Sequence, residues 1–175
     1  MMVKSHIIYI IGFMGSGKTT AGIKLASLLG WSFIDLDKKI EEYAGKTIPD
    51  IFSQEGEGYF RDLETRLLKT LKSCTDTIIS TGGGTPCYSD NMDFMLETGL
   101  TVYLKLTPGE LKNRLSDSKG ERPLIKGLGR EKLLSFIEDK LSDREKCYER
   151  SDIKIEGLNP DFNVLLSLIK SKLNN

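Results

Sequence analysis

The segment at residues 12–19 constrains the fold of this chain more than any other, because its sequence Gly-Phe-Met-Gly-Ser-Gly-Lys-Thr matches G-x-x-x-x-G-K-[ST]. An apolar run at residues 7–11 precedes it, and a helical pattern that runs to about Leu29 follows it. Glycines let backbone N–H groups wrap a phosphate without Cβ clashes, and the helix turns its positive N-terminus toward the same anion. Residues 12–19 therefore predict a phosphate loop, in which Lys18 reaches the terminal phosphates of a nucleotide and the Thr19 hydroxyl ligates Mg²⁺.

Short apolar runs alternate with longer helical stretches along the rest of the chain, which is the pattern of βαβ units around a parallel sheet. The predicted strands lie at residues 7–11, 32–35, 77–80, 100–106 and 153–155. Helices should cover both faces of such a sheet, and ligands should bind at the carboxyl ends of its strands. The 175 residues contain no repeat and no linker-like segment, so we expect a single domain over residues 1–175.

The region after the fourth predicted strand combines a marked helix start with an irregular segment. Thr107, Pro108 and Glu110 fit a capping box with proline at the first helical position. Residues 116–127 hold two glycines, one proline and five charged residues without periodicity. Loops of this size in compact domains are often lids, so we expect a mobile lid at about residues 114–127.

Composition argues against several classes of function. The chain has 25 basic and 25 acidic residues, whereas nucleic-acid-binding proteins normally carry a basic excess. The three cysteines form no C-x-x-C pair and there is one histidine, so we expect reduced thiols and no zinc site. The run at residues 7–11 is too short to span a membrane, and no cleavage site follows it. We therefore expect a cytoplasmic protein with no nucleic-acid or membrane partner, and a monomer because no coiled-coil stripe is present.

Two predicted strands end in residues suited to a ligand site. Asp35 and Asp37 close the second strand, and strand alternation would point both carboxylates to the same side. One could assist a metal ion while the other accepts a proton or positions a hydroxyl, but Asp37 could instead cap a helix that begins near Lys38. Residues 82–84, all glycine, follow the third strand. They indicate either close approach of the backbone to a ligand or a tight turn.

Charged residues fall on the apolar faces of two predicted helices. In the helix at residues 58–72, Glu64 lies within the apolar arc and Arg61 lies at its border. A buried carboxylate needs a partner, and Arg61 is within reach, so these two residues form either part of a ligand site or a purely structural pair. In the helix at residues 131–149, Arg144 continues an apolar stripe. An inward arginine meets the anion of a ligand or of another side chain.

Taken together, these features resemble the shikimate kinase family, in the family's order and over about residues 7–150. The matching segments are the phosphate loop, residues 33–37, residues 60–64, residues 82–84, residues 122–124, and Arg144 followed by Tyr148. The resemblance implies an α/β P-loop fold of the nucleoside-monophosphate-kinase type, with three layers and a five-stranded parallel sheet flanked by helices. It also implies transfer of the ATP γ-phosphate to the 3-hydroxyl of shikimate in aromatic amino-acid and chorismate biosynthesis. ATP and shikimate would be the partners and Mg²⁺ the cofactor.

The resemblance further implies roles for individual residues. Asp37 would hold the reacting hydroxyl, Glu64 would orient Arg61, and Arg122 would close over the phosphates. The catalytic residues would thus be Lys18, Asp37 and Arg122. ATP would contact Gly12, Gly15, Ser16, Gly17, Lys18, Thr19, Thr20, Arg114 and Arg122. Shikimate would bind in a region at about residues 37–64 and would contact Asp37, Arg61, Glu64, Gly82, Gly83, Gly84 and Arg144. The Mg²⁺ ion would be held by Thr19 and Asp35.

Some positions depart from the family's pattern. Cys147 and Ser151 stand in place of a bulkier aliphatic residue and an alanine, which affects packing more than chemistry. Residues 158–160 match the family's base-binding loop only loosely, so the adenine contacts stay unassigned.

Two other functions remain open from the sequence, namely a kinase for another small metabolite such as gluconate and a regulatory nucleotide-binding module without transfer activity. The paired aspartates and the glycine run favour shikimate. A pocket for a second substrate argues against the module.

Overall fold

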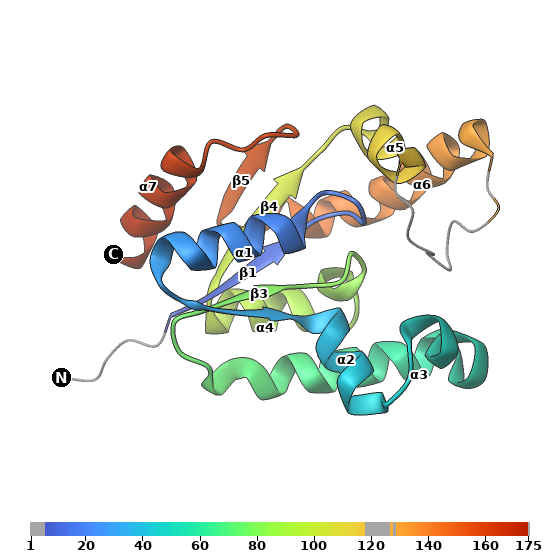
Figure 1. Ribbon diagram of the computed structural model, residues 1–175, viewed down its shortest axis with the longest axis horizontal. Helices are drawn as coiled ribbons and strands as arrows, with labels where there is room; N and C mark the ends of the chain where they lie inside the picture. Colours follow the sequence, from blue (N-terminus) through green and yellow to red (C-terminus); the bar gives the residue numbers. More distant parts are fainter. Residues whose placement is uncertain (1–5, 118–126, 128, 175) are drawn as a thin grey trace.

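Five parallel strands form one sheet in the computed structural model, which describes residues 6–117, 127 and 129–174 (Figure 1). In chain order the strands are β1 (Ile7–Ile11), β2 (Ser32–Asp35), β3 (Thr77–Ser80), β4 (Leu100–Lys105) and β5 (Ile153–Glu156). Their spatial order is β2-β3-β1-β4-β5, and every neighbouring pair is parallel. The predicted sheet is therefore confirmed, with β4 one residue shorter and β5 one residue longer than the apolar pattern indicated.

Helices connect the strands and cover the sheet on both faces. The α-helices of the described residues are α1 (Lys18–Leu29), α2 (Leu36–Ala44), α3 (Ile48–Thr70), α4 (Asn91–Thr98), α5 (Pro108–Asp117), α6 (Arg130–Tyr148) and α7 (Phe162–Leu173). Two short 3₁₀ helices, η1 (Leu71–Ser73) and η2 (Thr85–Cys87), follow α3 and β3. The segment predicted to be a lid, at about residues 114–127, lies largely outside the described residues and stays a prediction.

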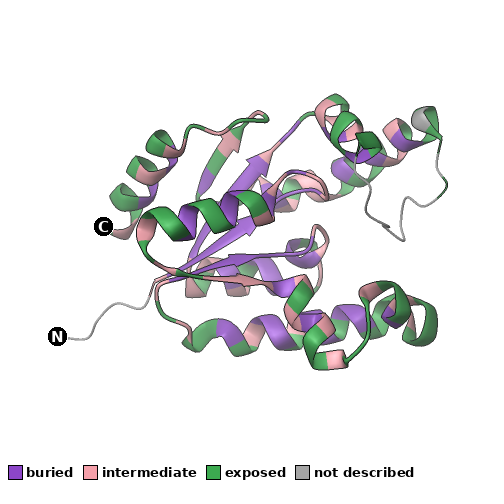
Figure 2. Cartoon of the chain, viewed as in Figure 1, coloured by how far each residue is buried: buried purple, intermediate pink, exposed green. Residues whose placement is uncertain are grey.

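Strand alternation decides which side chains of β1 face which layer of helices. Ile8 and Ile10 join the apolar cluster beneath α1 and α7. Ile7, Tyr9 and Ile11 join the larger cluster on the opposite face, beneath α2 to α6. All five residues are buried, as expected of a central parallel strand covered on both sides (Figure 2). The three-layer architecture follows directly from this double burial.

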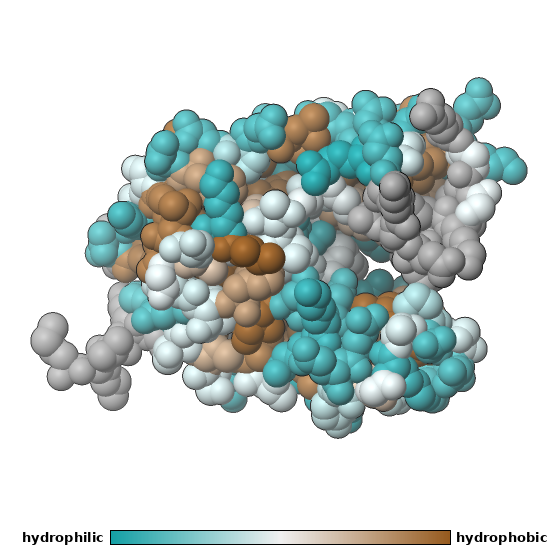
Figure 3. Space-filling model, in the orientation of Figure 1, coloured by the Kyte–Doolittle hydropathy of each residue, from teal (hydrophilic) through white to brown (hydrophobic). Residues whose placement is uncertain are grey.

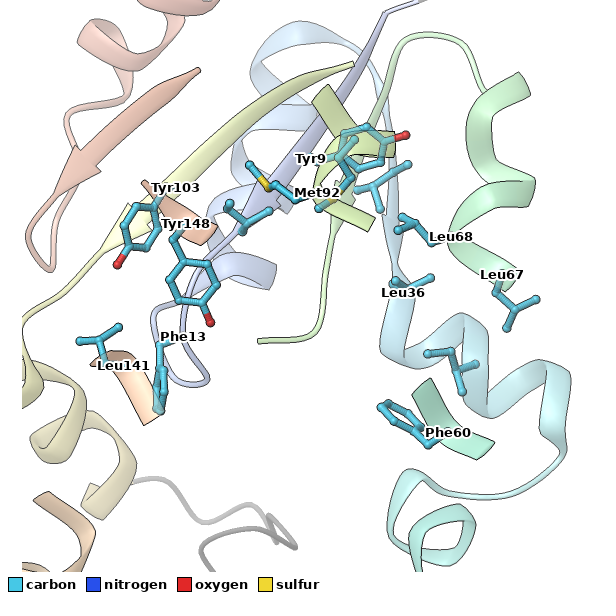
Figure 4. Close-up of a cluster of buried hydrophobic side chains, with 14 of the residues drawn as sticks. Tyr9, Phe13, Leu36, Phe60, Leu67, Leu68, Met92, Tyr103, Leu141 and Tyr148 are labelled. Carbon is cyan, nitrogen blue, oxygen red and sulfur yellow. The ribbon is translucent and has the colours of Figure 1, made fainter. Parts of the chain in front are cut away.

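Aromatic side chains fill the larger cluster on the side nearest to the phosphate loop (Figure 4). The rings of Tyr103 in β4 and Tyr148 in α6 lie 5.0 Å apart between centroids, and Phe13 of the phosphate loop is also buried there. The Tyr148 hydroxyl donates a hydrogen bond of 2.5 Å to the Gly83 carbonyl. This bond ties the end of α6 to the glycine run after β3.

The strand order reverses at β1, which has the later strand β4 on one side and β3 on the other. The chain leaves β1 toward α1 on one face, whereas it leaves β3 toward η2 and α4 on the opposite face. Connections that diverge in this way open a crevice at the carboxyl ends of the strands, where α/β proteins bind ligands. In Figure 1 this edge of the sheet faces right, between the α2–α3 and α5–α6 pairs.

The start of α3 differs from the prediction, since the helix begins at Ile48 rather than near residue 58. Thr47 caps it, with its hydroxyl accepting from the Asp50 N–H at 3.3 Å. Gly56 interrupts the helix with φ 85° and ψ 169°, so its two halves are not continuous. The apolar periodicity predicts only the second half of α3, because the break at Gly56 puts the first turns out of phase with it.

The capping box predicted at Thr107 and Glu110 is confirmed at the start of α5. The Thr107 hydroxyl accepts from the Glu110 N–H at 3.3 Å, and the Thr107 N–H donates to Glu110 Oε2 at 2.8 Å. Both bonds satisfy donors that a helix N-terminus otherwise leaves without partners.

Exposed apolar side chains gather over α1 and α7 on the face seen in Figure 3, away from the crevice. They include Ile23 and Leu28 of α1 and Val164 and Leu168 of α7. None of the helices in the described part of the chain is both long and apolar enough to cross a membrane.

We expect Gly22→Ala to destabilise the fold although it places a better helix former within α1. A Cβ at Gly22 would lie 2.5 Å from Phe33 Cε2, so the substitution overpacks the contact between α1 and the sheet. The free energy of unfolding should fall by about 1–3 kcal/mol. Gly58→Ala in α3 is the matched control, because none of the described residues comes within 4 Å of a Cβ there, and it should raise stability by about 0.5–1 kcal/mol. Urea unfolding of both variants measures the difference, and equal effects would contradict this account of α1 packing.

Candidate active site

A cavity of about 460 Å³ opens at the carboxyl ends of β1, β2 and β3 and gathers most of the predicted site residues. Among them are Gly15, Gly17, Lys18, Thr19, Thr20, Asp35, Asp37, Arg61, Glu64, Gly82, Gly83, Gly84, Arg114 and Arg144. Gly12 and Ser16 are not part of this lining, and Arg122 lies outside the described residues. The cavity thus joins the phosphate loop to the carboxylates and arginines that were predicted after the second strand and on the two helices.

The phosphate loop wraps around the side chain of its own lysine. Lys18 Nζ donates hydrogen bonds to the carbonyls of Gly12 at 3.0 Å and Phe13 at 2.9 Å. Gly12 has φ 146°, and a Cβ there would lie 2.8 Å from the Leu104 carbonyl oxygen, so this glycine lets the loop close against β4. Ser16 Oγ is buried and finds no hydrogen-bond partner among the described residues. A buried hydroxyl of this kind at a helix N-terminus suits an anionic ligand.

Asp35 links the phosphate loop to the end of β2. The Thr19 hydroxyl donates to Asp35 Oδ2 at 2.8 Å, while Asp35 Oδ1 accepts from the N–H groups of Asp37 at 3.1 Å and Lys38 at 3.3 Å. Asp35 is therefore the N-cap of α2, and the alternative that Asp37 caps this helix is wrong. The reason is that α2 begins at Leu36, directly after the strand, so Asp37 already lies in the first helical turn. Both carboxylates reach the cavity, but not through strand alternation.

The carboxyl of Asp37 has a perturbed proton affinity. Burial raises its pKa to about 6, and the nearby carboxylates of Glu64 and Asp35 act in the same direction. Lys18 and Arg61 oppose this effect only in part. A carboxylate poised near neutral pH in a cavity can accept a hydrogen bond or a proton from a hydroxyl.

Arg61 and Glu64 form the buried ion pair anticipated from their spacing. Arg61 Nη1 donates to Glu64 Oε2 at 2.7 Å, and Arg61 Nε also lies 3.5 Å from Glu57 Oε1. The second oxygen of Glu64 accepts a 2.5 Å hydrogen bond from the Thr85 hydroxyl. Thr85 was not identified from the sequence, because it lies 21 residues from its partner and no local pattern connects the two.

The glycine run is explained by side-chain packing. None of Gly82, Gly83 and Gly84 has a positive φ, so a left-handed turn does not require them. A Cβ at Gly82 would lie 2.8 Å from Glu64 Oε1, and one at Gly84 would overlap the Arg61 guanidinium. A Cβ at Gly83 would lie 3.0 Å from the backbone nitrogen of Met14 in the phosphate loop. The run is glycine because the Arg61–Glu64 pair and the phosphate loop occupy the space that side chains would need.

Arg144 enters the cavity from α6 as a half-buried side chain. Its guanidinium carbon lies 5.6 Å from the centroid of the Phe13 ring, a cation–π arrangement. None of the ion pairs within the described ranges involves Arg144. The alternative of a structural carboxylate partner for this arginine therefore finds no support in the described part of the chain.

The remaining lining consists of an arginine and an apolar wall. Arg114 Nη2 would lie 3.2 Å from a Cβ at Gly17, which places it beside the phosphate loop. Ile48, Phe52 and Phe60 form the wall, and the two phenylalanine rings lie 4.7 Å apart. Ile48 and Phe52 were missed in the sequence because they belong to the first half of α3, before the Gly56 kink.

A phosphate loop at the point where strand order reverses, in one cavity with carboxylates and arginines, is typical of the class of P-loop kinases. The family model for shikimate kinase matches residues 14–165. The chain belongs to the shikimate kinase family.

Individual relatives agree with this family assignment. Shikimate kinase from Parabacteroides distasonis is 44% identical over 150 residues, covering 86% of this chain and 87% of the relative. The crystal structure of shikimate kinase from Bacteroides thetaiotaomicron has a TM-score of 0.86 at 37% identity, over 95% of this chain and 96% of that one. Shikimate kinase from Acinetobacter baumannii in complex with shikimate has a TM-score of 0.85 at 37% identity, over 96% and 94% of the two chains.

We expect Asp37→Asn to stabilise the protein at alkaline pH. A carboxyl with its pKa raised to about 6 binds a proton more tightly in the folded than in the unfolded state, whose reference value is 3.8. Stability therefore falls as the pH rises through this window, and the penalty is fully present above about pH 6. Removing it should raise the free energy of unfolding at pH 8 by about 3 kcal/mol, and the gain should vanish near pH 3.5.

Unfolding by urea at both pH values, in EDTA and without nucleotide, measures this effect. Asp139→Asn on the exposed side of α6 is the matched control and should show no such pH-dependent gain. An Asp37→Asn protein that is no more stable than the wild type at pH 8 would contradict the destabilising charge assigned to Asp37.

Proposed function

We propose that this protein transfers the γ-phosphate of ATP to the 3-hydroxyl of shikimate and releases shikimate 3-phosphate and ADP. The observation that carries the proposal is a single cavity lined by both the phosphate loop and the buried Arg61–Glu64 pair, in a chain of the shikimate kinase family. The relative from Acinetobacter baumannii, whose structure is in complex with shikimate, supports the same substrate. The product would feed chorismate and aromatic amino-acid biosynthesis.

The acceptor half of the cavity suits a small hydroxy acid. Arg61 has one nitrogen on Glu64, and Arg144 pairs with none of the carboxylates of the described residues, so their guanidinium groups are proposed to grip the substrate carboxylate. Asp37 is proposed to position the reacting hydroxyl and to accept its proton, since its pKa of about 6 leaves it ionised at neutral pH. The backbone of Gly82, Gly83 and Gly84 would close the pocket over the substrate.

The other half of the cavity suits the nucleotide. The N–H groups of the phosphate loop and the Lys18 ammonium are proposed to bind the phosphates, with Ser16, Thr19 and Thr20 alongside. Arg114 lies beside this loop and is proposed to contact the nucleotide. Arg122 is proposed to close over the phosphates from a lid at about residues 114–127. Phosphoryl transfer depends mainly on positioning and charge neutralisation, which this set of groups supplies.

Thr19 and Asp35 are proposed to hold Mg²⁺. Their oxygens lie 2.8 Å apart, and Mg²⁺ in kinases is typically bound by one or two protein oxygens together with substrate phosphates and water. No three His, Cys, Asp or Glu side chains converge within the described residues, so the substrate would supply further ligands. When bound, the ion would neutralise charge on the transferring phosphate.

We further propose that residues 1–175 act as one kinase domain, with residues 37–64 as the substrate-binding region. A monomer in the cytoplasm, without nucleic-acid or membrane partners, would suffice for this reaction. The alternatives of a gluconate kinase and of a regulatory module are not favoured by the family assignment.

The substrate assignment is tested by ADP release in a coupled assay against a panel of hydroxy acids. ADP release should require Mg²⁺ and should rise sharply with shikimate but not with gluconate. Equal stimulation by both acids would contradict the assignment, and so would an absence of stimulation by either.

Arg144→Ala should weaken shikimate binding by about 2–5 kcal/mol, the usual loss when one member of a desolvated charge pair is removed. Nucleotide affinity and melting temperature should change little, because Arg144 takes part in none of the ion pairs of the described residues. Calorimetric titration of each ligand beside a thermal melt measures both effects. Arg150→Ala, which removes an arginine paired with Asp93 at the surface, is the control and should leave shikimate affinity intact. A destabilised Arg144→Ala protein with normal shikimate affinity would show that Arg144 is structural.

A further inference from the structure

Each oxygen of the buried Glu64 carboxylate has its own hydrogen-bond donor. Arg61 Nη1 donates to Oε2 at 2.7 Å, and the Thr85 hydroxyl donates to Oε1 at 2.5 Å. Glu64 is 0% exposed, so its carboxylate depends on these two protein donors in place of water. Without the Thr85 hydroxyl, Oε1 would be a charged acceptor without a partner, which is the costliest kind of unsatisfied group.

Thr85 is itself held rigidly at the start of η2. Its N–H donates to the Gly82 carbonyl at 3.3 Å, and its own carbonyl accepts from Asn91 Nδ2 at 2.9 Å. Asn91 Nδ2 also donates to the Thr65 hydroxyl of α3 at 3.0 Å, so one amide ties η2 to the helix that carries Glu64. Thr85 and Asn91 are both 0% exposed. The β-branched side chain of Thr85 further restricts the direction of its hydroxyl.

The Thr85 hydroxyl lies beside the acceptor pocket as well as beside Glu64. A Cβ at Gly82 would lie 2.8 Å from Glu64 Oε1, 3.0 Å from Thr85 Oγ1 and 3.1 Å from Asp37 Oδ1. Three oxygens from separate elements thus surround one point on the cavity wall. The Thr85 hydroxyl donates its proton to Glu64 Oε1, so these two oxygens are paired by a hydrogen bond.

The state of Glu64 decides how Arg61 is presented to the cavity. With Oε1 satisfied by Thr85, Glu64 needs only Nη1 of Arg61. Nε of Arg61 lies 3.5 Å from Glu57 Oε1, and Nη2 lies beside Gly84 at the cavity wall. An unsatisfied Oε1 would draw a second nitrogen of Arg61, because arginine and carboxylate readily pair through two parallel bonds. The guanidinium would then turn toward Glu64 and away from the substrate.

We propose that Thr85 is a positioning residue for the acceptor substrate: its hydroxyl holds Glu64 so that Nη2 of Arg61 stays available to the cavity. This inference rests on the proposed function, since it concerns the affinity for the substrate carboxylate. Thr85 acts through Glu64 and Arg61 and does not itself need to touch the substrate. Its loss should therefore raise the Kd and KM for shikimate, with little change in the KM for ATP.

Thr85→Val tests the proposal, because it keeps the shape of the side chain and removes the donor. The Kd for shikimate should rise about 10-fold, which corresponds to about 1.4 kcal/mol. The KM for ATP should change less than about threefold, since the hydrogen bonds of Glu64 among the described residues run to Arg61 and Thr85 on the acceptor side of the cavity. Thr85→Ser restores the hydroxyl and should bring the Kd back to within about twofold of the wild type.

Thr65→Val is the matched control, because it removes a hydrogen bond of the same network that does not reach Glu64. It should lower the melting temperature and leave the Kd for shikimate unchanged. If Thr85→Val does not fold, Thr85→Ala is measured in its place with the same expectation.

The Kd for shikimate is measured in every variant by calorimetric titration. Initial rates give the KM values, and thermal melts give the melting temperatures. Wild-type affinity in the protein without the hydroxyl would overturn the proposal. An equal loss in Thr65→Val would also overturn it, and so would a failure of Thr85→Ser to restore binding. A wild-type protein that neither binds nor phosphorylates shikimate would instead contradict the proposed function, before any variant is compared.

Discussion

The ion pair between Arg61 and Glu64 is almost excluded from water, since the two residues are 8% and 0% exposed. Removing one member of such a pair leaves an uncompensated buried charge, which typically costs about 3–5 kcal/mol. The neighbouring structure is arranged around this constraint. Gly82 and Gly84 lack side chains because Glu64 and Arg61 occupy that space, and Thr85 satisfies the oxygen that Arg61 does not reach. The same buried charge contributes to the raised pKa of Asp37, so the chemistry of the cavity depends on the pair as well.

The fully buried strand β1 supports the other half of the cavity. Its two faces pack against separate layers of helices, so the phosphate loop that follows it starts from a rigid base. Thr19 from α1 and Asp35 from β2 meet beside this loop, while Arg61 comes from α3 and Arg144 from α6. The residues are far apart in the chain and meet only because parallel strands end at one edge of the sheet.

Much of the fold follows from local patterns. The strands could be predicted because strands of a parallel sheet are short apolar runs, and the start of α5 could be predicted because a capping box is a contact between near neighbours. The first half of α3 could not, since Gly56 breaks its periodicity. The cap of α2 was assigned to Asp37 in one interpretation, whereas α2 follows β2 without a loop and uses Asp35. A shift of two residues in a helix start depends on how the preceding strand packs, and the local sequence pattern does not specify it.

The residues of the candidate site also divide into those that the sequence predicts and those that only the folded structure shows. The phosphate loop, the inward Glu64 and the inward Arg144 were evident from the sequence, because their meaning rests on a contiguous motif or on helical spacing. The partner of Glu64 at Thr85, the wall of Ile48 and Phe52, and the packing reason for the glycine run appear only once the chain is folded. Each of these is a contact between elements that are distant in sequence. The amino-acid order alone determines which groups are available, and the packing of α3, η2 and α6 on the sheet determines which of those groups meet.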